Sequence, residues 1–277
     1  MDEPIVLLPG EGEVLADQES RWSRIKVARD ECLLFESRYA PGERGAAPHV
    51  HREHADAFYV LEGELVFRIA SEQRRLSAGS FVLAPPGLVH GFDVGPHGVR
   101  HLNLHAPGQA FARLSRARRD RAPFDAAEGD TFDPPADGGL SVSQAVVLGP
   151  GEGEKAGDSV VKAARPELSL LEGFVEPDEE VEPHLHRGHS DSFYVLEGEL
   201  EFLVGDRVVT APAESFVLSP PGVIHGFRNV SGRKARVLNL HAPGGFVEYR
   251  RTLAELRGRG ETPDRAFYER HDVFAPG

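Results

Sequence analysis

The chain has 277 residues, 40% of them hydrophobic and 27% charged, which is typical of a soluble globular protein long enough for two domains. Its net charge of -13 disfavours nucleic acid and an anionic membrane surface as partners, because both carry negative charge. No run of about 18 apolar residues is present, and the acidic start lacks the basic segment of a signal peptide, so we expect a cytoplasmic protein. Cys32 is the only cysteine, which excludes intrachain disulfides and a thiolate-rich zinc site.

Taken in chain order, the first half predicts short strands rich in Val, Leu, Phe and Tyr, separated by Gly, Pro and charged turns. These strands are residues 32–39, 56–63, 64–70, 80–85, 89–94 and 101–106. Residues 110–121 and 245–258 instead carry apolar residues three to four apart, which indicates an amphipathic helix near the end of each half. The pattern predicts an all-β protein with two antiparallel barrels, each followed by one C-terminal helix.

The second half repeats the first. Corresponding blocks are 48–65 and 183–200, 80–92 and 215–227, 5–13 and 146–154, 102–108 and 238–244, and the tails 120–132 and 264–274. A repeat of about 135 residues is a whole domain rather than a solenoid unit. A Pro- and Gly-rich stretch at 134–139 favours a linker, so we expect one domain over 1–138 and another over 139–277.

Three histidines and one aspartate recur at matching positions: His49, His51, Asp56 and His90, then His184, His186, Asp191 and His225. On a strand, residues i and i+2 point to the same side, so the first two histidines of each set project together. Three imidazoles and a carboxylate suit Fe, Mn, Ni, Cu or Zn as divalent ions, whereas a hydrophobic core has no need to repeat them. We therefore expect two metal ions per chain; the alternative is an emptied site that keeps histidines as polar core residues.

At these residues the chain resembles the cupin superfamily, and specifically its two-domain members, the bicupins. The first cupin motif matches His49, His51, Asp56 and Gly63, and again His184, His186, Asp191 and Gly198. The second matches Gly79, Pro85, Gly87 and His90, then Pro220, Gly222, His225 and Asn229. The resemblance implies two tandem double-stranded β-helix (jelly-roll) barrels that pack as an internal pseudo-dimer, with a homo-oligomer left open.

A few positions depart from the family pattern. Asp56 and Asp191 stand where the family has glutamate, Val94 replaces an asparagine, and Glu214 replaces a glycine. An aspartate carboxylate ends roughly 1.5 Å short of a glutamate carboxylate. We therefore expect a three-histidine metal site with the aspartate close by, as a base or as a hydrogen-bond acceptor for a ligating histidine. Direct ligation by the aspartate is the alternative.

Other residues near the motifs have more ordinary interpretations. His54 and His189 lie in a bend and are expected to be exposed, with a substitute fourth ligand as the alternative. Side chains on one face of the last strand are expected to line the pocket or cap its rim: Asn103, His105, Asn239 and His241. Core positions are predicted for Phe58, Tyr59, Phe193 and Tyr194 and, as a buried inert thiol, for Cys32.

The resemblance to quercetinase-type cupins implies an O2-dependent dioxygenase that acts on a small chelating substrate such as an enediol, a flavonol or a diketone. In that scheme three histidines hold Fe or Mn, the favoured metals, and Asp56 or Asp191 accepts the hydroxyl proton of the substrate. A non-catalytic metal- or small-molecule-binding cupin and a metal-assisted isomerase or cyclase are the alternatives, because one fold hosts many chemistries. A low lysine share, four of 31 basic residues, indicates a GC-rich bacterial genome.

Overall fold

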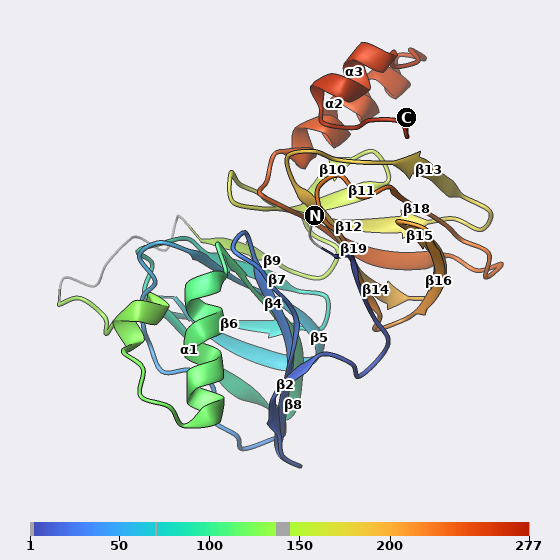
Figure 1. Cartoon of the computed structure of the whole chain (residues 1–277). Coiled ribbons are helices and arrows are strands. Elements are labelled where there is room, and N and C mark those ends of the chain that lie inside the picture. Colours follow the sequence, from blue (N-terminus) through green and yellow to red (C-terminus); the bar gives the residue numbers. More distant parts are fainter. Residues whose placement is uncertain (1–2, 70, 137–144, 277) are drawn as a thin grey trace. The chain divides into compact units, whose positions relative to one another are not determined.

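The computed structural model describes residues 3–69, 71–136 and 145–276 (Figure 1). The chain forms two compact units: Gly12–Glu152, here the N-terminal barrel, and Met1–Glu11 with Gly153–Gly277, here the C-terminal barrel. The predicted domain boundary after residue 138 lies outside the described residues. Each unit is built mainly of antiparallel strands, which confirms the all-β prediction.

The N-terminal barrel is one eight-stranded sheet in the order β2-β3-β4-β8-β5-β7-β9, with β6 paired to β5. Its strands are β2 (Glu13–Asp17), β3 (Arg21–Ala28), β4 (Leu33–Tyr39), β5 (Ala55–Ile69), β6 (Glu72–Ser77), β7 (Phe81–Ala84), β8 (His90–Ala106) and β9 (Val146–Leu148).

The C-terminal barrel has two sheets, ordered β1-β17-β14-β19-β12-β11-β10 and β13-β18-β15-β16. Its strands are β1 (Ile5–Leu7), β10 (Glu154–Ala156), β11 (Ser159–Ala164), β12 (Ser169–Val175), β13 (Glu180–His184), β14 (Ser190–Glu197), β15 (Glu199–Val204), β16 (Arg207–Pro212), β17 (Phe216–Ser219), β18 (His225–Arg228) and β19 (Ala235–Ala242).

The first strand of each half completes the barrel of the other half. β1 pairs antiparallel with β17, so Ile5 lies opposite Leu218. β9 pairs in the same way with β7, so Leu148 lies opposite Phe81. The repeated blocks at 5–13 and 146–154 contain these strands, and residues 5–11 and 146–152 of the blocks belong to the unit formed mostly by the other copy.

Two long strands replace four that the sequence predicts for the N-terminal barrel. β5 unites the segments expected at 56–63 and 64–70, and β8 unites those expected at 89–94 and 101–106. The register of β5 against β8 shifts near Gly63, which has a φ of +72° and whose added Cβ would lie 2.2 Å from the carbonyl oxygen of Gly98. Glycine thus lets the strand bend without a break, as at a β-bulge.

Alternating apolar residues build the interior of each barrel. Leu65, Phe67 and Ile69 are fully buried in β5, and Leu200, Phe202 and Val204 take the matching places in β15. Burying one such side chain contributes about 1.5–3 kcal/mol. The aromatic pairs predicted for the core are confirmed as buried: Phe58, Tyr59, Phe193 and Tyr194.

Both predicted helices are present, and further helical turns follow them. α1 (Gln109–Asp120) buries Leu114, and α2 (Phe246–Gly258) buries Leu253. The 3-10 helix η1 (Ala126–Gly129) and helix α3 (Arg265–Arg270) were not predicted, because four to six residues carry too little periodicity to be recognised. Figure 1 shows α1 beside the strands of its barrel and α2 and α3 at one end of theirs. Among the residues described, no helix is both long and apolar enough to cross a membrane.

Candidate metal centres

Backbone pairing brings three histidines of the N-terminal barrel together. His49 and His90 exchange backbone hydrogen bonds of 2.8 and 2.9 Å, so two segments 41 residues apart lie side by side. Gly91 makes this approach feasible, because a Cβ there would lie 2.7 Å from the carbonyl oxygen of Ala46. His51, two residues after His49, projects toward the same point, and its ring lies 4.8 Å from that of His49.

Each of these rings is oriented by a hydrogen bond from Nδ1 to a backbone carbonyl. His49 donates to Ala47 at 2.7 Å, His90 donates to Leu88 at 2.8 Å, and His51 donates to Asp130 at 2.7 Å. A neutral imidazole that donates from Nδ1 keeps an unprotonated Nε2 with a free lone pair. All three rings therefore present the atom that binds a metal.

The Nε2 atoms and one carboxylate oxygen converge. Nε2 of His49 lies 3.2 Å from Nε2 of His51, and Oδ2 of Asp56 lies 3.1 Å from Nε2 of His90 and 3.7 Å from Nε2 of His51. Bonds of about 2.1 Å at right angles around one ion would separate neighbouring ligand atoms by about 3 Å. These donors are thus spaced as ligands of a single ion, and their facing lone pairs repel one another until a cation binds. The set fits a divalent transition metal.

The second copy repeats this geometry. Nδ1 of His184, His186 and His225 donates to the carbonyls of Glu182, Asp272 and Val223 at 2.9, 2.6 and 2.9 Å respectively. Oδ2 of Asp191 lies 3.2 Å from Nε2 of His225 and 3.7 Å from Nε2 of His186. In both copies the four donor atoms fall within 4.8 Å of one another.

The aspartate of each centre is held by an asparagine. Nδ2 of Asn103 donates to Oδ1 of Asp56 at 2.5 Å and to the carbonyl of Ala57 at 3.0 Å, and Asn103 Oδ1 accepts from Nε2 of His105 at 3.2 Å. Asn103 and His105 are 5% and 0% exposed, so they lie inside the barrel rather than at its rim. Oδ1 of Asp56 is thereby turned toward Asn103 and Oδ2 toward the histidines.

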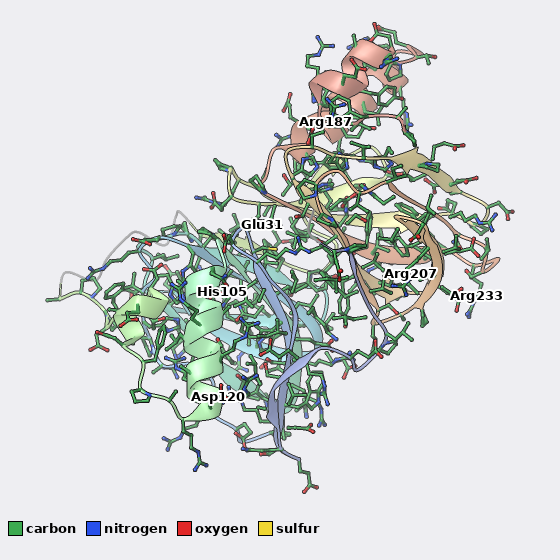
Figure 2. All side chains as sticks on the ribbon, in the orientation of Figure 1. Glu31, His105, Asp120, Arg187, Arg207 and Arg233 are labelled. Atoms are coloured by element: carbon green, nitrogen blue, oxygen red, sulfur yellow. The ribbon has the colours of Figure 1, made fainter. Side chains whose placement is uncertain are left out.

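The second copy shows the same support. Nδ2 of Asn239 donates to Oδ1 of Asp191 at 2.6 Å, and Nε2 of His241 donates to Asn239 Oδ1 at 2.9 Å. Figure 2 labels His105 near the first turn of α1, where Phe111 stacks on its ring with centroids 3.9 Å apart. Phe246 of α2 stacks on His241 in the same way, at 3.7 Å.

Burial and neighbouring groups set the protonation of the donors. Burial raises the pKa of a carboxyl, yet the surrounding imidazoles hold the pKa values of Asp56 and Asp191 well below their usual range. Burial lowers the pKa values of His49 and His184 to about 4. Despite burial, Asp191 and Asp272 raise the pKa of His186 above its usual value. Near pH 7, His49 and His184 are therefore neutral and both aspartates are ionised, the forms that bind metal.

His54 and His189 are not exposed loop residues, as the sequence led us to expect, because they are only 2% and 8% exposed. Nδ1 of His54 lies 2.8 Å from Oδ2 of Asp130, and Nδ1 of His189 lies 3.0 Å from Oδ2 of Asp272. An aspartate from far along the chain thus fixes each ring. His54 also stacks on His51 with centroids 4.0 Å apart.

Asp130 fastens the tail of its copy across the metal-binding loop. Its carboxylate accepts backbone hydrogen bonds from Arg52, Glu53 and His54 at 2.9, 2.8 and 3.2 Å, while its own carbonyl orients His51. The carboxylate of Asp272 accepts from Arg187 and Gly188 at 2.9 and 2.8 Å. The sequence repeat placed both tails in register but gave no role to the aspartates. The signal available was the recurrence of an aspartate two residues before a phenylalanine.

Cys32 takes no part in either centre. It is fully buried, and burial raises the pKa of its thiol to about 12, which confirms the prediction of an inert cysteine.

Comparison with known proteins supports the duplication. The family model described as Cupin domain matches residues 35–98 and again residues 173–241. The sequence is 22% identical to the quercetin 2,3-dioxygenase of Bacillus subtilis (strain 168) over 291 residues, which covers 91% of this chain and 86% of that enzyme.

Two solved structures illustrate the likeness in fold. A variant of the oxalate decarboxylase of Bacillus subtilis has a TM-score of 0.57 at 14% identity, covering 87% of this chain and 78% of the other. The protein Ylba from E. coli has a TM-score of 0.61 at 10% identity, covering 86% of this chain and 90% of the other. At these identities the likeness concerns the fold alone.

Proposed function

Because this chain is a bicupin of the cupin superfamily, we propose that it is a metal-dependent oxygenase with one divalent ion in each barrel. Iron or manganese is the favoured metal, and nickel, copper and zinc are alternatives that the same donors accept. The ligands proposed for the N-terminal centre are His49, His51, Asp56 and His90. Those proposed for the C-terminal centre are His184, His186, Asp191 and His225.

One observation carries this proposal: the Nε2 lone pairs of three histidines face one another and a carboxylate oxygen. Since every Nδ1 already donates to a backbone carbonyl, a neutral ring has no proton at Nε2 with which to relieve the repulsion. A cation satisfies all four donors at once.

The same geometry favours Asp56 and Asp191 as ligands over the three-histidine arrangement expected from side-chain length. Oδ2 of Asp56 lies as close to Nε2 of His90, at 3.1 Å, as neighbouring ligands on one ion do. A carboxyl whose pKa is held well below its usual range is also a weak base at neutral pH. We therefore assign both aspartates to metal binding first, and to proton transfer only through a substrate hydroxyl bound beside them.

Similarity to a quercetin 2,3-dioxygenase supports a dioxygenase acting on a small chelating substrate, such as an enediol, a flavonol or a diketone. Four protein ligands leave about two positions of a six-coordinate ion for other ligands. When bound, the metal supplies Lewis-acid chemistry and, for iron or manganese, redox chemistry. The histidines hold their lone pairs on it, and Asn103 and Asn239 keep each carboxylate turned for binding.

A non-catalytic metal-binding protein is the second candidate, and burial favours it. His51, Asp56 and His90 are 1%, 2% and 2% exposed, so a substrate reaches the N-terminal centre mainly past the half-buried His49. The oxalate decarboxylase with the same fold carries out a different reaction, so the fold does not choose between chemistries. A metal-assisted isomerase or cyclase is the third candidate.

The test begins with the metal content of unsupplemented protein, measured by elemental analysis. Oxygen uptake is then measured with Fe(II)- and Mn(II)-loaded protein against catechols, flavonols and β-diketones. We expect two ions per chain and substrate-dependent uptake that the double variant His49→Ala with His184→Ala loses. Full metal occupancy without uptake across the panel would favour the binding protein, and unchanged stoichiometry in the double variant would refute the ligand assignment.

A further inference from the structure

A second group of buried histidines lies beside each candidate metal centre. One ring nitrogen from each of His51, His54 and His105 falls within 4.8 Å of the others, and His186, His189 and His241 form the same group in the C-terminal barrel. Two members of each group are not ligands of the first centre. Each of these two has a ring nitrogen that is buried and has no hydrogen-bond partner: Nε2 of His54 and His189, and Nδ1 of His105 and His241.

The tautomer of His54 follows from its aspartate. Asp130 accepts three backbone N–H groups, so its carboxylate is an acceptor, and its pKa is lowered to about 2 by His54 and these backbone hydrogen bonds despite burial. Nδ1 of His54, 2.8 Å from Oδ2, therefore carries the proton and donates it. In the neutral ring the partnerless Nε2 is then a lone pair, oriented as in the carboxylate–histidine pairs that hold metals.

The tautomer of His105 follows from its asparagine. Asn103 must turn its amide nitrogen toward the two acceptors Asp56 and Ala57, so its oxygen faces His105. Nε2 of His105, 3.2 Å from that oxygen, is then the donor. Nδ1 of His105 is left as a lone pair in a ring that is 0% exposed.

Each barrel thus holds two acceptor lone pairs that face no donor. A buried acceptor without a partner costs about 1–3 kcal/mol, so leaving two of them in both copies is expensive. His51 cannot relieve them, because its Nδ1 donates to the carbonyl of Asp130 and its Nε2 belongs to the first centre. A cation beside both rings would accept these electron pairs, and one ring nitrogen of His54 lies within 4.8 Å of one of His105.

The surroundings select the kind of cation. The ring of Phe111 stacks on His105, and no carboxylate oxygen reaches Nε2 of His54 or Nδ1 of His105 as a hydrogen-bond partner. A second divalent ion would be repelled by the first at close range and would have no anionic ligand of its own. A soft monovalent ion tolerates two imidazole ligands, and two bonds of about 2 Å span roughly 4 Å.

We propose that each barrel contains a second metal site, in which Nε2 of His54 and Nδ1 of His105, or Nε2 of His189 and Nδ1 of His241, bind a Cu(I)-class cation. Asp130 and Asp272 orient the first ring of each pair, and Asn103 and Asn239 orient the second. This proposal rests on the proposed function in one respect: the divalent ion of the first centre is the reason why the second site prefers a monovalent ion. The ligands of the second site are different residues.

The test titrates Cu(I), without oxygen and against a competing Cu(I) chelator, into protein whose first centres are loaded with Mn(II). We expect two Cu(I) per chain while two Mn(II) per chain are retained, and an X-ray absorption spectrum with two nitrogens near 2 Å. Release of Mn(II) as Cu(I) binds, or no Cu(I) uptake, would overturn the proposal. If a buried water bridges the two lone pairs instead, the protein takes up no Cu(I).

Variants separate this site from the first. His54→Phe with His189→Phe keeps the rings stacked but removes the lone pairs, and we expect Cu(I) affinity to fall at least 100-fold with Mn(II) content unchanged. We expect the same loss of Cu(I) affinity in His105→Phe with His241→Phe. This second pair of variants keeps the proposal testable if the first pair fails to fold. The exposed His97 serves as the control, since His97→Gln should bind like the parent. In His49→Ala with His184→Ala, the first centres are lost and Cu(I) binding is expected to persist. Unchanged Cu(I) affinity in both phenylalanine pairs would refute the assignment.

Discussion

The donor atoms of the two candidate metal centres are spaced alike, but the aspartates that cover the centres differ in solvent exposure. The carboxylate oxygen lies 3.1 Å from one ligating histidine in the N-terminal centre and 3.2 Å in the C-terminal centre. The side chain of Asp130, which clamps the first centre, is 6% exposed, whereas that of Asp272 is 28% exposed. Both centres take their donors from the same repeated motifs, while the shielding of each centre depends on the tail that crosses it.

Strand continuity differs as well. At the position where β8 runs through Val94 without a break, the C-terminal barrel has Asn229 between β18 and β19. Nδ2 of Asn229 donates to the carbonyls of Val175 and Arg233 at 2.9 and 2.6 Å, and its oxygen accepts from the backbone of Ser231 at 3.1 Å. A buried amide thus holds a loop in one copy where an apolar residue continues a strand in the other. The metal donors are unaffected, so the barrel tolerates either solution.

The largest effect should come from removing one histidine at a time. His51→Ala and His186→Ala should each reduce metal content from two ions per chain to one, with affinity at the altered centre falling about 1000-fold, because a neutral ligand and its oriented lone pair are lost. Elemental analysis and competitive metal titration measure this. The centres would not be independent if either variant lost both ions.

Acid should destabilise the metal-free protein partly through one histidine that only the N-terminal barrel has. Burial lowers the pKa of His101 to about 4, and Val237 takes its place in the other copy. The unfolded state binds this proton first, so stability falls as the pH drops from about 6.5 to about 4, by about 3 kcal/mol in all. His101→Phe should remove that part of the loss. Urea unfolding at pH 7 and pH 4.5 gives the comparison, and an unchanged difference would contradict it.

The clamping aspartates should contribute unequally to stability. Asp130→Asn should cost about 2 kcal/mol, because its buried carboxylate accepts three backbone hydrogen bonds and one from His54. Asp272→Asn should cost about 1 kcal/mol, since water screens its more exposed carboxylate. Thermal unfolding of both variants measures the two losses of stability. A larger loss for Asp272→Asn than for Asp130→Asn would contradict the prediction.

The ligating aspartates should matter equally in the two centres. Asp56→Asn and Asp191→Asn should each weaken metal binding 10- to 100-fold at the altered centre, because an anionic ligand becomes neutral. Binding curves for Mn(II) or Co(II) measure the change. Affinity within about twofold of the parent in both variants would restore the three-histidine site expected from side-chain length.

The smallest effect concerns one turn. Glu214 has a φ of +74° where the N-terminal barrel has Gly79 with a φ of +85°. Glu214→Gly should stabilise the protein by about 1 kcal/mol, because only glycine adopts this conformation without strain. Gly79→Glu should destabilise it, since an added Cβ would also lie 3.2 Å from Pro150. Denaturant unfolding tests both, and a loss of stability on Glu214→Gly would show that the glutamate side chain matters more than the strain.

The sequence revealed the parts of the site that depend on neighbours along the chain. The alternation of histidines at 49 and 51 and the repeat at 184 and 186 identified two donor pairs, because strand geometry fixes where residues i and i+2 point. Strand composition and turn residues identified the all-β fold. Strand breaks were less predictable, because a bulge at Gly63 and a loop at Asn229 occupy equivalent barrels without altering the apolar pattern.

Only the tertiary structure decided which groups meet across long separations. That Asp130 would lie against His54, and Asp272 against His189, depends on how the tails pack over the barrels, and no local period encodes such contacts. The burial of His54 and the lone pair of His105 follow from the same packing. The sequence by itself therefore determined the donors and their duplication, because a backbone period fixes them locally. Folding determined how the donors are shielded and how His51 and His186 are oriented, because these features depend on atoms brought together from distant segments.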